Sequence, residues 1–73
     1  MYLYLIKRTD DVGHDETESV IIAALAPAPA RKIAQSVRGD QLPEVWLSAS
    51  IKNIGKASRD IKPGIVHTAF REG

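Results

Sequence analysis

The stretch SVIIAALAPAPARKIAQSVRG, residues 19–39, joins a predicted strand directly to a predicted helix. Its first part, residues 19–24, is an apolar and largely β-branched run, which is typical of a strand. Apolar residues of the second part recur at the spacing of one helix face, and they are Ala30, Ile33, Ala34 and Val37. Pro fits the first helical turn, and Gly39 is a typical residue just after a helix ends. We therefore predict a helix over residues 29–38.

Residues 2–6, YLYLI, are aromatic and aliphatic without a break, and the chain turns polar at residues 7–9. This composition predicts a strand, and the near-continuous apolar run favours a central strand covered on much of both faces. Tyr2, Tyr4 and Ile6 share one face of the strand because side chains alternate. We expect that face to pack against the core, and an exposed aromatic stripe is the alternative.

Residues 10–13, DDVG, have the composition of a turn, because Asp bonds locally to the backbone and Gly tolerates a positive φ. The apolar runs on either side of this polar segment therefore predict a β-hairpin. Residues 44–47 contain the only Trp of the chain. They are predicted to form either a short strand or a plug that covers the core.

Two further strands are predicted in the C-terminal half. They cover residues 50–57, where broken alternation indicates a bulge near residues 53–55, and residues 65–70. Residues 71–73 are expected to form a free tail. The chain, residues 1–73, is then a single α+β domain of order β-β-α-β-β, in which one helix covers one face of a small, mainly antiparallel sheet.

The composition excludes several classes of protein. The chain has 73 residues and no Cys, which rules out disulfides and thiolate zinc sites. Its apolar fraction of 44% and charged fraction of 26% are typical of a folded domain and argue against disorder. No apolar run approaches the ~20 residues that a membrane-spanning helix needs. Met1 leads into the first apolar run without a basic segment, so we expect no signal peptide and a cytoplasmic protein.

Five acids lie within residues 10–18, together with His14. A calcium loop of the EF-hand type needs Gly at its sixth position and Glu at its twelfth, and neither start, Asp10 or Asp11, provides them. His14 and the two acids after it are adjacent, and the side chains of neighbouring residues rarely converge on one ion. We therefore expect no metal and no cofactor, and interpret the segment as a solvated turn or a loop that faces a partner.

No pattern for catalysis is present. The chain lacks a nucleophile elbow, a triad signature, a phosphate-binding loop and a dinucleotide fingerprint. A hairpin loop in so small a domain also offers little of the cleft that a pair of catalytic carboxylates requires. We therefore expect a binding protein and not an enzyme.

Charge is divided along the chain, although the formal net charge is only +1. Residues 10–18 carry acids and no Lys or Arg, whereas residues 51–71 are basic with one acid, so the two segments either pair or present faces of opposite sign. The residues that we expect to contact a partner are Asp10, Asp11, His14, Asp15, Glu16, Glu18, Tyr2 and Tyr4. A basic face is predicted from Lys52, Lys56, Arg59 and Lys62. These cations also suit phosphates, but aromatic side chains that could stack on bases are few, so direct nucleic-acid binding is an alternative.

Several segments match a known pattern in order and spacing. They are Tyr4-Leu-Ile, Val12-Gly-His-Asp, Ser19–Ala24, Ala30-Arg-Lys-Ile, Ile54-Gly-Lys-Ala57 and Gly64–Gly73. Together they cover most of the chain and resemble a family of small proteins common in phage genomes and prophages. The sequence departs from that family at His14, where Tyr is common, and at residues 26–30, where Pro and Ala replace acids. The segment that contains Trp46 is also shorter than in the family.

The resemblance implies a phage or prophage source and therefore a host-cytoplasm setting, and it implies no activity. By size and class alone, the chain is also similar to small phage regulators that bind host RNA polymerase and to small anti-CRISPR proteins. We therefore expect a host-directed binding protein that binds host RNA polymerase and inhibits or regulates transcription. The alternatives are an inhibitor of a host defence complex and an accessory domain that binds nucleic acid.

Overall fold

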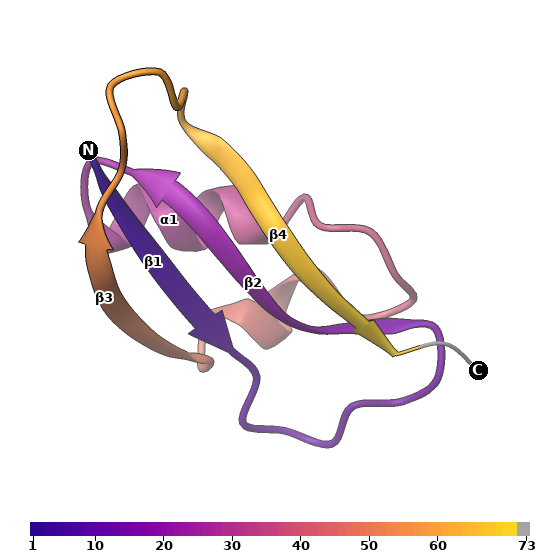
Figure 1. Cartoon of the computed structure of the whole chain (residues 1–73). Coiled ribbons are helices and arrows are strands. Elements are labelled where there is room, and N and C mark those ends of the chain that lie inside the picture. The colour runs from indigo at the N-terminus through magenta and orange to yellow at the C-terminus, as the bar shows by residue number, and fades with distance from the viewer. Residues whose placement is uncertain (72–73) are drawn as a thin grey trace.

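The computed structural model describes residues 1–71. Its elements are β1 (Tyr2–Lys7), β2 (Glu16–Ala24), α1 (Pro27–Ala34), the 3-10 helix η1 (Pro43–Trp46), β3 (Ser50–Lys56) and β4 (Gly64–Arg71). The strands form one antiparallel sheet of order β3-β1-β2-β4, and α1 lies behind it in the view of Figure 1. The predicted α+β class and the order β-β-α-β-β are confirmed, with η1 as an addition between helix and third strand.

The N-terminal hairpin supplies the centre of the sheet, and the C-terminal half supplies both edges. β1 pairs with β2 and with β3, and β2 pairs with β4. Residues 57–63 must therefore pass from one edge to the other, around the end of the sheet where β1 begins (Figure 1). The prediction that residues 2–6 form a central strand is confirmed.

The core lies between the sheet and the two helices. It is built from Tyr4, Ile6, Val20, Ile22, Ala24, Ala30, Ala34, Val37, Trp46 and Ala49. Tyr4 and Ile6 are buried, so most of the face predicted to pack does pack, whereas Tyr2 stays 38% exposed. Trp46 is the last residue of η1 and is fully buried in the core. The prediction that this segment covers the core is therefore confirmed, and the alternative of a short strand is wrong. The Trp46 indole N–H has no hydrogen-bond partner within residues 1–71.

Helix α1 begins and ends earlier than the predicted range of residues 29–38. It ends at Ala34 because the next two backbone hydrogen bonds join residues three apart, where an α-helix joins residues four apart. The Ser36 N–H donates to Ile33 O at 3.0 Å, and the Val37 N–H donates to Ala34 O at 3.1 Å. Gly39 has the positive φ of +124° expected after a helix, but it lies in the following loop. Val37 lies in the same loop and is buried in the core. The apolar spacing that predicted the helix therefore continues beyond the last helical residue.

The sheet is interrupted by bulges on three strands. The register shifts between Leu3 and Tyr4 opposite Asn53–Gly55, which confirms the bulge predicted in β3. Further shifts in the β2–β4 pairing leave Glu18 of β2 and Val66 of β4 between paired positions. Each shift places one extra residue on a strand, so side chains there depart from simple alternation.

Strand ends also differ from the predicted ones. β2 begins at Glu16 and not at residue 19, and β4 extends to Arg71, which was expected in a free tail. The remaining tail residues, 72–73, lie outside the described part of the chain. No helix within residues 1–71 is long and apolar enough to cross a membrane.

Candidate functional site

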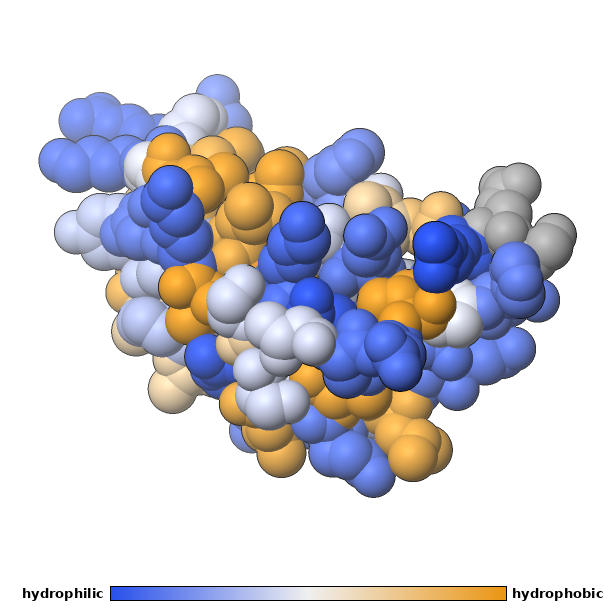
Figure 2. All heavy atoms as spheres, turned by 90° about the horizontal axis from the view of Figure 1, so that it is seen from below, coloured by the Kyte–Doolittle hydropathy of each residue, from blue (hydrophilic) through white to orange (hydrophobic). Residues whose placement is uncertain are grey.

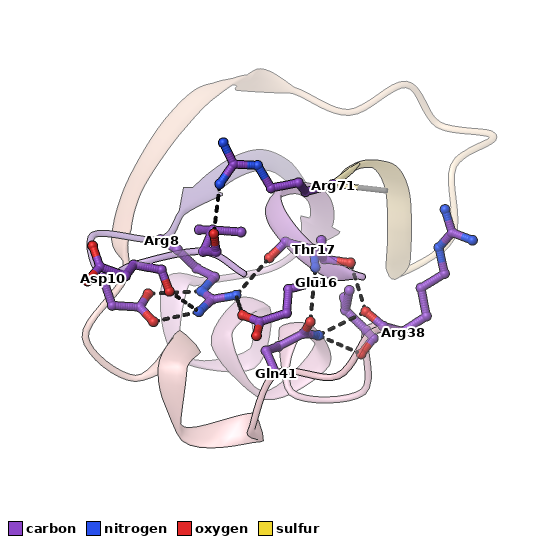
Figure 3. Close-up of polar contacts among 10 residues, drawn as sticks. Arg8, Asp10, Glu16, Thr17, Arg38, Gln41 and Arg71 are labelled. Carbon is purple, nitrogen blue, oxygen red and sulfur yellow. Dashed lines mark hydrogen bonds and ion pairs between the residues drawn. The ribbon is translucent and has the colours of Figure 1, made fainter. Parts of the chain in front are cut away.

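Arg8 organises the acidic segment that was predicted as a contact surface. It follows the last residue of β1 on the core side of the sheet and is 6% exposed. Its Nε donates to Asp10 Oδ1 at 2.9 Å, its Nη2 to Asp10 Oδ2 at 2.5 Å, and its Nη1 to Glu16 Oε1 at 2.6 Å (Figure 3). The same guanidinium donates to Thr17 O at 3.3 Å and Asp11 O at 3.2 Å. Asp10 and Glu16 therefore have a structural role.

This arrangement changes the acidity of both carboxyl groups. Hydrogen bonds from Arg8, more than any other cause, lower the pKa of Asp10 and the pKa of Glu16 below their usual ranges. The bond to Asp10 in turn raises the pKa of Arg8 above its usual range, against an opposing effect of burial. All three groups therefore stay charged at neutral pH.

The backbone of residues 8–15 is held at several points along its length. Arg71 Nη1 donates to Val12 O at 2.7 Å, and the Asp15 N–H donates to Arg71 O at 2.7 Å. The Asp40 N–H donates to Asp15 O at 2.9 Å. The turn falls at residues 14–15, where Asp15 has φ +60°, and not at residues 10–13 as predicted. Contacts from β4 and from the loop after α1 thus shape this segment.

Gln41 fastens the loop after α1 to the start of β2. The Thr17 N–H donates to Gln41 Oε1 at 2.9 Å, and Gln41 Nε2 donates to Arg38 O at 2.8 Å and Val37 O at 3.2 Å (Figure 3). Thr17, fully buried, donates from Oγ1 to Arg38 O at 2.7 Å. Arg38 places its guanidinium carbon 4.1 Å from the centre of the Phe70 ring. This end of the molecule is therefore ordered by polar contacts.

The other predicted contact residues of this segment lie at its surface. Asp11, His14, Asp15 and Glu18 are exposed, and Figure 2 looks onto this end, where hydrophilic side chains surround separate hydrophobic patches. Tyr2 is half exposed and meets Tyr4 edge to face, with ring centres 6.4 Å apart. Tyr4 itself is 5% exposed, so the core uses its ring and the geometry does not support it as a partner contact.

The predicted basic residues are exposed, but they do not form a single face. Lys56 pairs across the sheet with Tyr2, and Arg59 and Lys62 follow in the loop of residues 57–63. They therefore lie at the end of the sheet where β1 begins. Lys52 pairs with Leu5 near the middle of β1. The acidic segment follows Lys7 at the far end of β1, so it lies away from Lys56, Arg59 and Lys62. Arg71, the last cation of the basic segment, is the exception, because it pairs across the sheet with Glu16 and its Nη1 donates to Val12 O.

Exposed apolar side chains gather in the same half of the sheet as these cations. Eight large hydrophobic residues are exposed within residues 1–71, and two of them, Leu42 and Leu47, flank η1. The other six are Met1, Tyr2, Leu25, Ile54, Ile65 and Val66. They come from the start of β1, the corner after β2, the second half of β3 and the start of β4. We call these six residues, with Lys56, Arg59 and Lys62, the apolar–basic half.

Sequence reasoning missed the aliphatic members of this surface. Leu25 is 71% exposed, although it follows directly on a buried strand. Ile54 and Val66 lie at the bulges of β3 and β4, where alternation fails. The available signal was a large aliphatic residue at a position that breaks the period of its strand.

Other kinds of site are not formed by the described residues. Within residues 1–71, no three His, Asp or Glu side chains come together as metal ligands, and no pocket is present. Comparison of the chain with models of protein families, with curated proteins and with solved structures found no match.

Proposed function

We propose that this chain is a phage-type, host-directed binding protein that works in the host cytoplasm without catalysing a reaction. One observation carries the proposal: six of the eight large hydrophobic side chains exposed within residues 1–71 lie toward the end of the sheet where β1 begins, beside Lys56, Arg59 and Lys62. Exposed apolar side chains scattered singly are normal, whereas a group of them bordered by polar residues is typical of an interaction surface.

The charges of this surface favour an acidic protein partner. Lys56, Arg59 and Lys62 lie beside the apolar residues, and Asp60 is the one acid within residues 51–71. Charged groups at the rim of an interface mainly speed association and orient the complex, while the apolar centre supplies the affinity. A partner with an apolar patch bordered by carboxylates therefore fits best.

Host RNA polymerase is the partner that we propose first, and regulation of transcription is the resulting function. This choice rests on the likeness to small phage regulators. A host defence complex is the second candidate, supported by the likeness to small anti-CRISPR proteins. Both candidates would need the same kind of binding surface on the partner: an apolar centre with an acidic rim.

The test is affinity capture from host lysate with the full chain, tagged after Gly73 because Met1 belongs to the proposed surface. The variant Leu25→Ser/Ile65→Thr removes apolar area from the apolar–basic half. The matched control is Leu42→Ser/Leu47→Ser, because both leucines are exposed and lie beside η1. Circular dichroism establishes that each variant is folded.

We expect the wild-type chain and the control to recover polymerase subunits, and the variant to lose them. Recovery of a defence complex with the same dependence on Leu25 and Ile65 would replace the polymerase assignment by the second candidate. Equal capture by variant and control would contradict the proposed surface.

A further inference from the structure

The sheet has a second face, which neither α1 nor η1, the helices of residues 1–71, covers. Side chains that are directly opposite in an antiparallel pair lie on the same face, so the register identifies its residues. They form three rows: Lys52-Leu5-Ile21-His67, Gly55-Leu3-Ala23-Gly64 and Ser50-Lys7-Ser19-Ala69. We call these three rows the open face. In Figure 1 it is the side of the sheet turned away from α1.

The centre of the open face is apolar and partly accessible, although Ala23 within it is fully buried. Leu3, Leu5 and Ile21 of the two central strands are only partly buried. No atom of residues 1–71 lies within 4 Å of a Cβ atom built on Gly55 or on Gly64, so the described part of the chain leaves both edge positions open. A partner can therefore approach the backbone closely on either side of Leu3.

The charge on the open face has one sign. Lys7 and Lys52 are exposed, His67 is exposed on β4, and none of the three rows contains Asp or Glu. The exposed His67 adds a polar group at the β4 edge. The nearest acid along β2 is Glu18, at the bulge beyond the third row. An occupant of this face thus needs an apolar strip with carboxylates beside it.

We propose that the open face is a docking site for an acidic amphipathic helix of a partner protein. Neighbouring strands lie about 4.8 Å apart, so the outer strands of this sheet are about 14 Å apart. A helix with its side chains is about 10–12 Å wide, so one helix fits between the outer strands. Its apolar ridge packs on Leu3, Leu5 and Ile21, and its carboxylates meet Lys7 and Lys52.

Two other occupants fit the open face less well. A second copy of the chain, packed face to face, would bring the lysines of both copies together, and like charges at an interface oppose association. Single-stranded nucleic acid needs aromatic side chains on which bases stack. The three rows contain none, because Tyr4 and Trp46 are in the core and Phe70 lies under Arg38.

This inference rests on the proposed function only in taking the chain to be a binding protein, since it concerns a different surface. The probe is an 18-residue helical peptide with Leu along one side and Glu on both flanks. A second peptide carries Lys in place of every Glu. Each is titrated into the isotope-labelled full chain, and amide and methyl NMR signals are followed. A twelve-nucleotide poly-thymidine strand is the nucleic-acid arm.

We expect the Leu–Glu peptide to shift signals of Leu3, Leu5 and Ile21, and the Leu–Lys peptide to leave them unchanged. The variant Lys7→Glu/Lys52→Glu should weaken binding by at least about tenfold, since rim charges orient and attract the partner. The control Lys56→Glu/Lys62→Glu carries the same change of charge in the apolar–basic half. It should alter the affinity by less than about twofold.

Three results would overturn the inference: equal binding of both peptides, signal shifts confined to the apolar–basic half, or tighter binding of the oligonucleotide at the open face. The outcome is separate from that of the proposed function, because the peptide titration uses no host protein. A failed capture from lysate, combined with peptide binding at the open face, would reject the first proposal and leave the second standing.

Discussion

Arg8 shows how one side chain can change the meaning of a charged segment. In the sequence, the acids of residues 10–18 exceed what a turn requires. In the structure, Arg8 forms ion pairs with two of them, Asp10 and Glu16. Arg is suited to this position because its planar fork serves two carboxylates and two carbonyl groups at once. Its burial in turn depends on both carboxylates, because an unpaired buried charge is strongly destabilising.

Arg8→Lys should destabilise the fold by about 1–3 kcal/mol, because an ammonium group cannot reproduce the bidentate bond to Asp10. Chemical denaturation followed by Trp fluorescence measures the loss. The control is Arg38→Lys, which keeps a charge on an exposed residue over Phe70 and should change stability by less than about 0.5 kcal/mol. Equal effects of the two substitutions would contradict a structural role for Arg8.

Stability should fall in acid because the pKa values of Asp10 and Glu16 are lower in the folded chain than in the unfolded one. Groups with such lowered values stabilise the fold fully above their unfolded pKa values, near pH 4, and this contribution is lost as pH falls through the folded values. Denaturation from pH 7 down to pH 2 measures the loss. The variant Asp10→Asn/Glu16→Gln should be less stable at pH 7 and lose less on acidification. A pH profile parallel to that of the wild type would contradict this origin.

At the scale of elements, the loop after α1 does more than connect α1 to η1, because it also contributes to the core and to the start of β2. It carries Val37 into the core, and through Gln41 it satisfies the Thr17 N–H at the start of β2. Arg31 of α1 makes a similar link to η1, since its Nη1 donates to Trp46 O at 2.8 Å and Ala49 O at 2.7 Å. Helix, loop and 3-10 helix are thus fixed to each other by side-chain bonds to backbone groups.

Gly39→Ala should destabilise the fold by about 1–3 kcal/mol. A Cβ at this φ of +124° is strained, and it would also collide with the Gln41 amide oxygen and lie 3.1 Å from the Thr17 nitrogen. The matched control is Gly55→Ala, where φ is also positive but no atom of the described residues, 1–71, lies within 4 Å of the added Cβ. Thermal unfolding of both variants separates collision from strain. Equal losses would show that the contact with Gln41 contributes nothing.

At the scale of the whole molecule, charge and exposed apolar area are separated along a body whose longest dimension is 36 Å. The acidic segment lies at one end of β1, and the apolar–basic half lies toward the other. The open face occupies the side of the sheet opposite α1. A chain with a net charge of only +1 thereby presents distinct surfaces of different chemistry.

Association with the captured partner should slow as salt rises, because the cations of the apolar–basic half are exposed and screened within about 10 Å at 0.1 M salt. Stopped-flow measurements at NaCl concentrations from about 0.05 M to about 0.5 M give the association and dissociation rates. Lys56→Glu/Lys62→Glu should lower the association rate and flatten its salt dependence, with little change in dissociation. A salt effect carried by the dissociation rate would contradict a role for these lysines at the rim.

Much of the fold could be predicted from local pattern. The apolar runs of residues 2–6 and 19–24 predict the central strands, and the Trp segment was recognised as a possible core plug. The ends of elements do not follow from local pattern, because they depend on partners elsewhere in the chain. β2 begins at Glu16, where pairing with Arg71 becomes possible, and α1 ends where the following loop turns toward Thr17.

Sequence by itself determined the α+β class, the central hairpin and the division of charge, because these follow from the period of apolar residues and from composition. Tertiary structure alone decided which charges are used within the fold and which apolar residues stay exposed. Arg8 meets Glu16 across a loop. Lys56 and Ile65 lie on opposite edges at the same end of the sheet only because the C-terminal strands flank the hairpin on both sides. These contacts depend on which distant segments pair with each other, and the local sequence carries little information about that pairing.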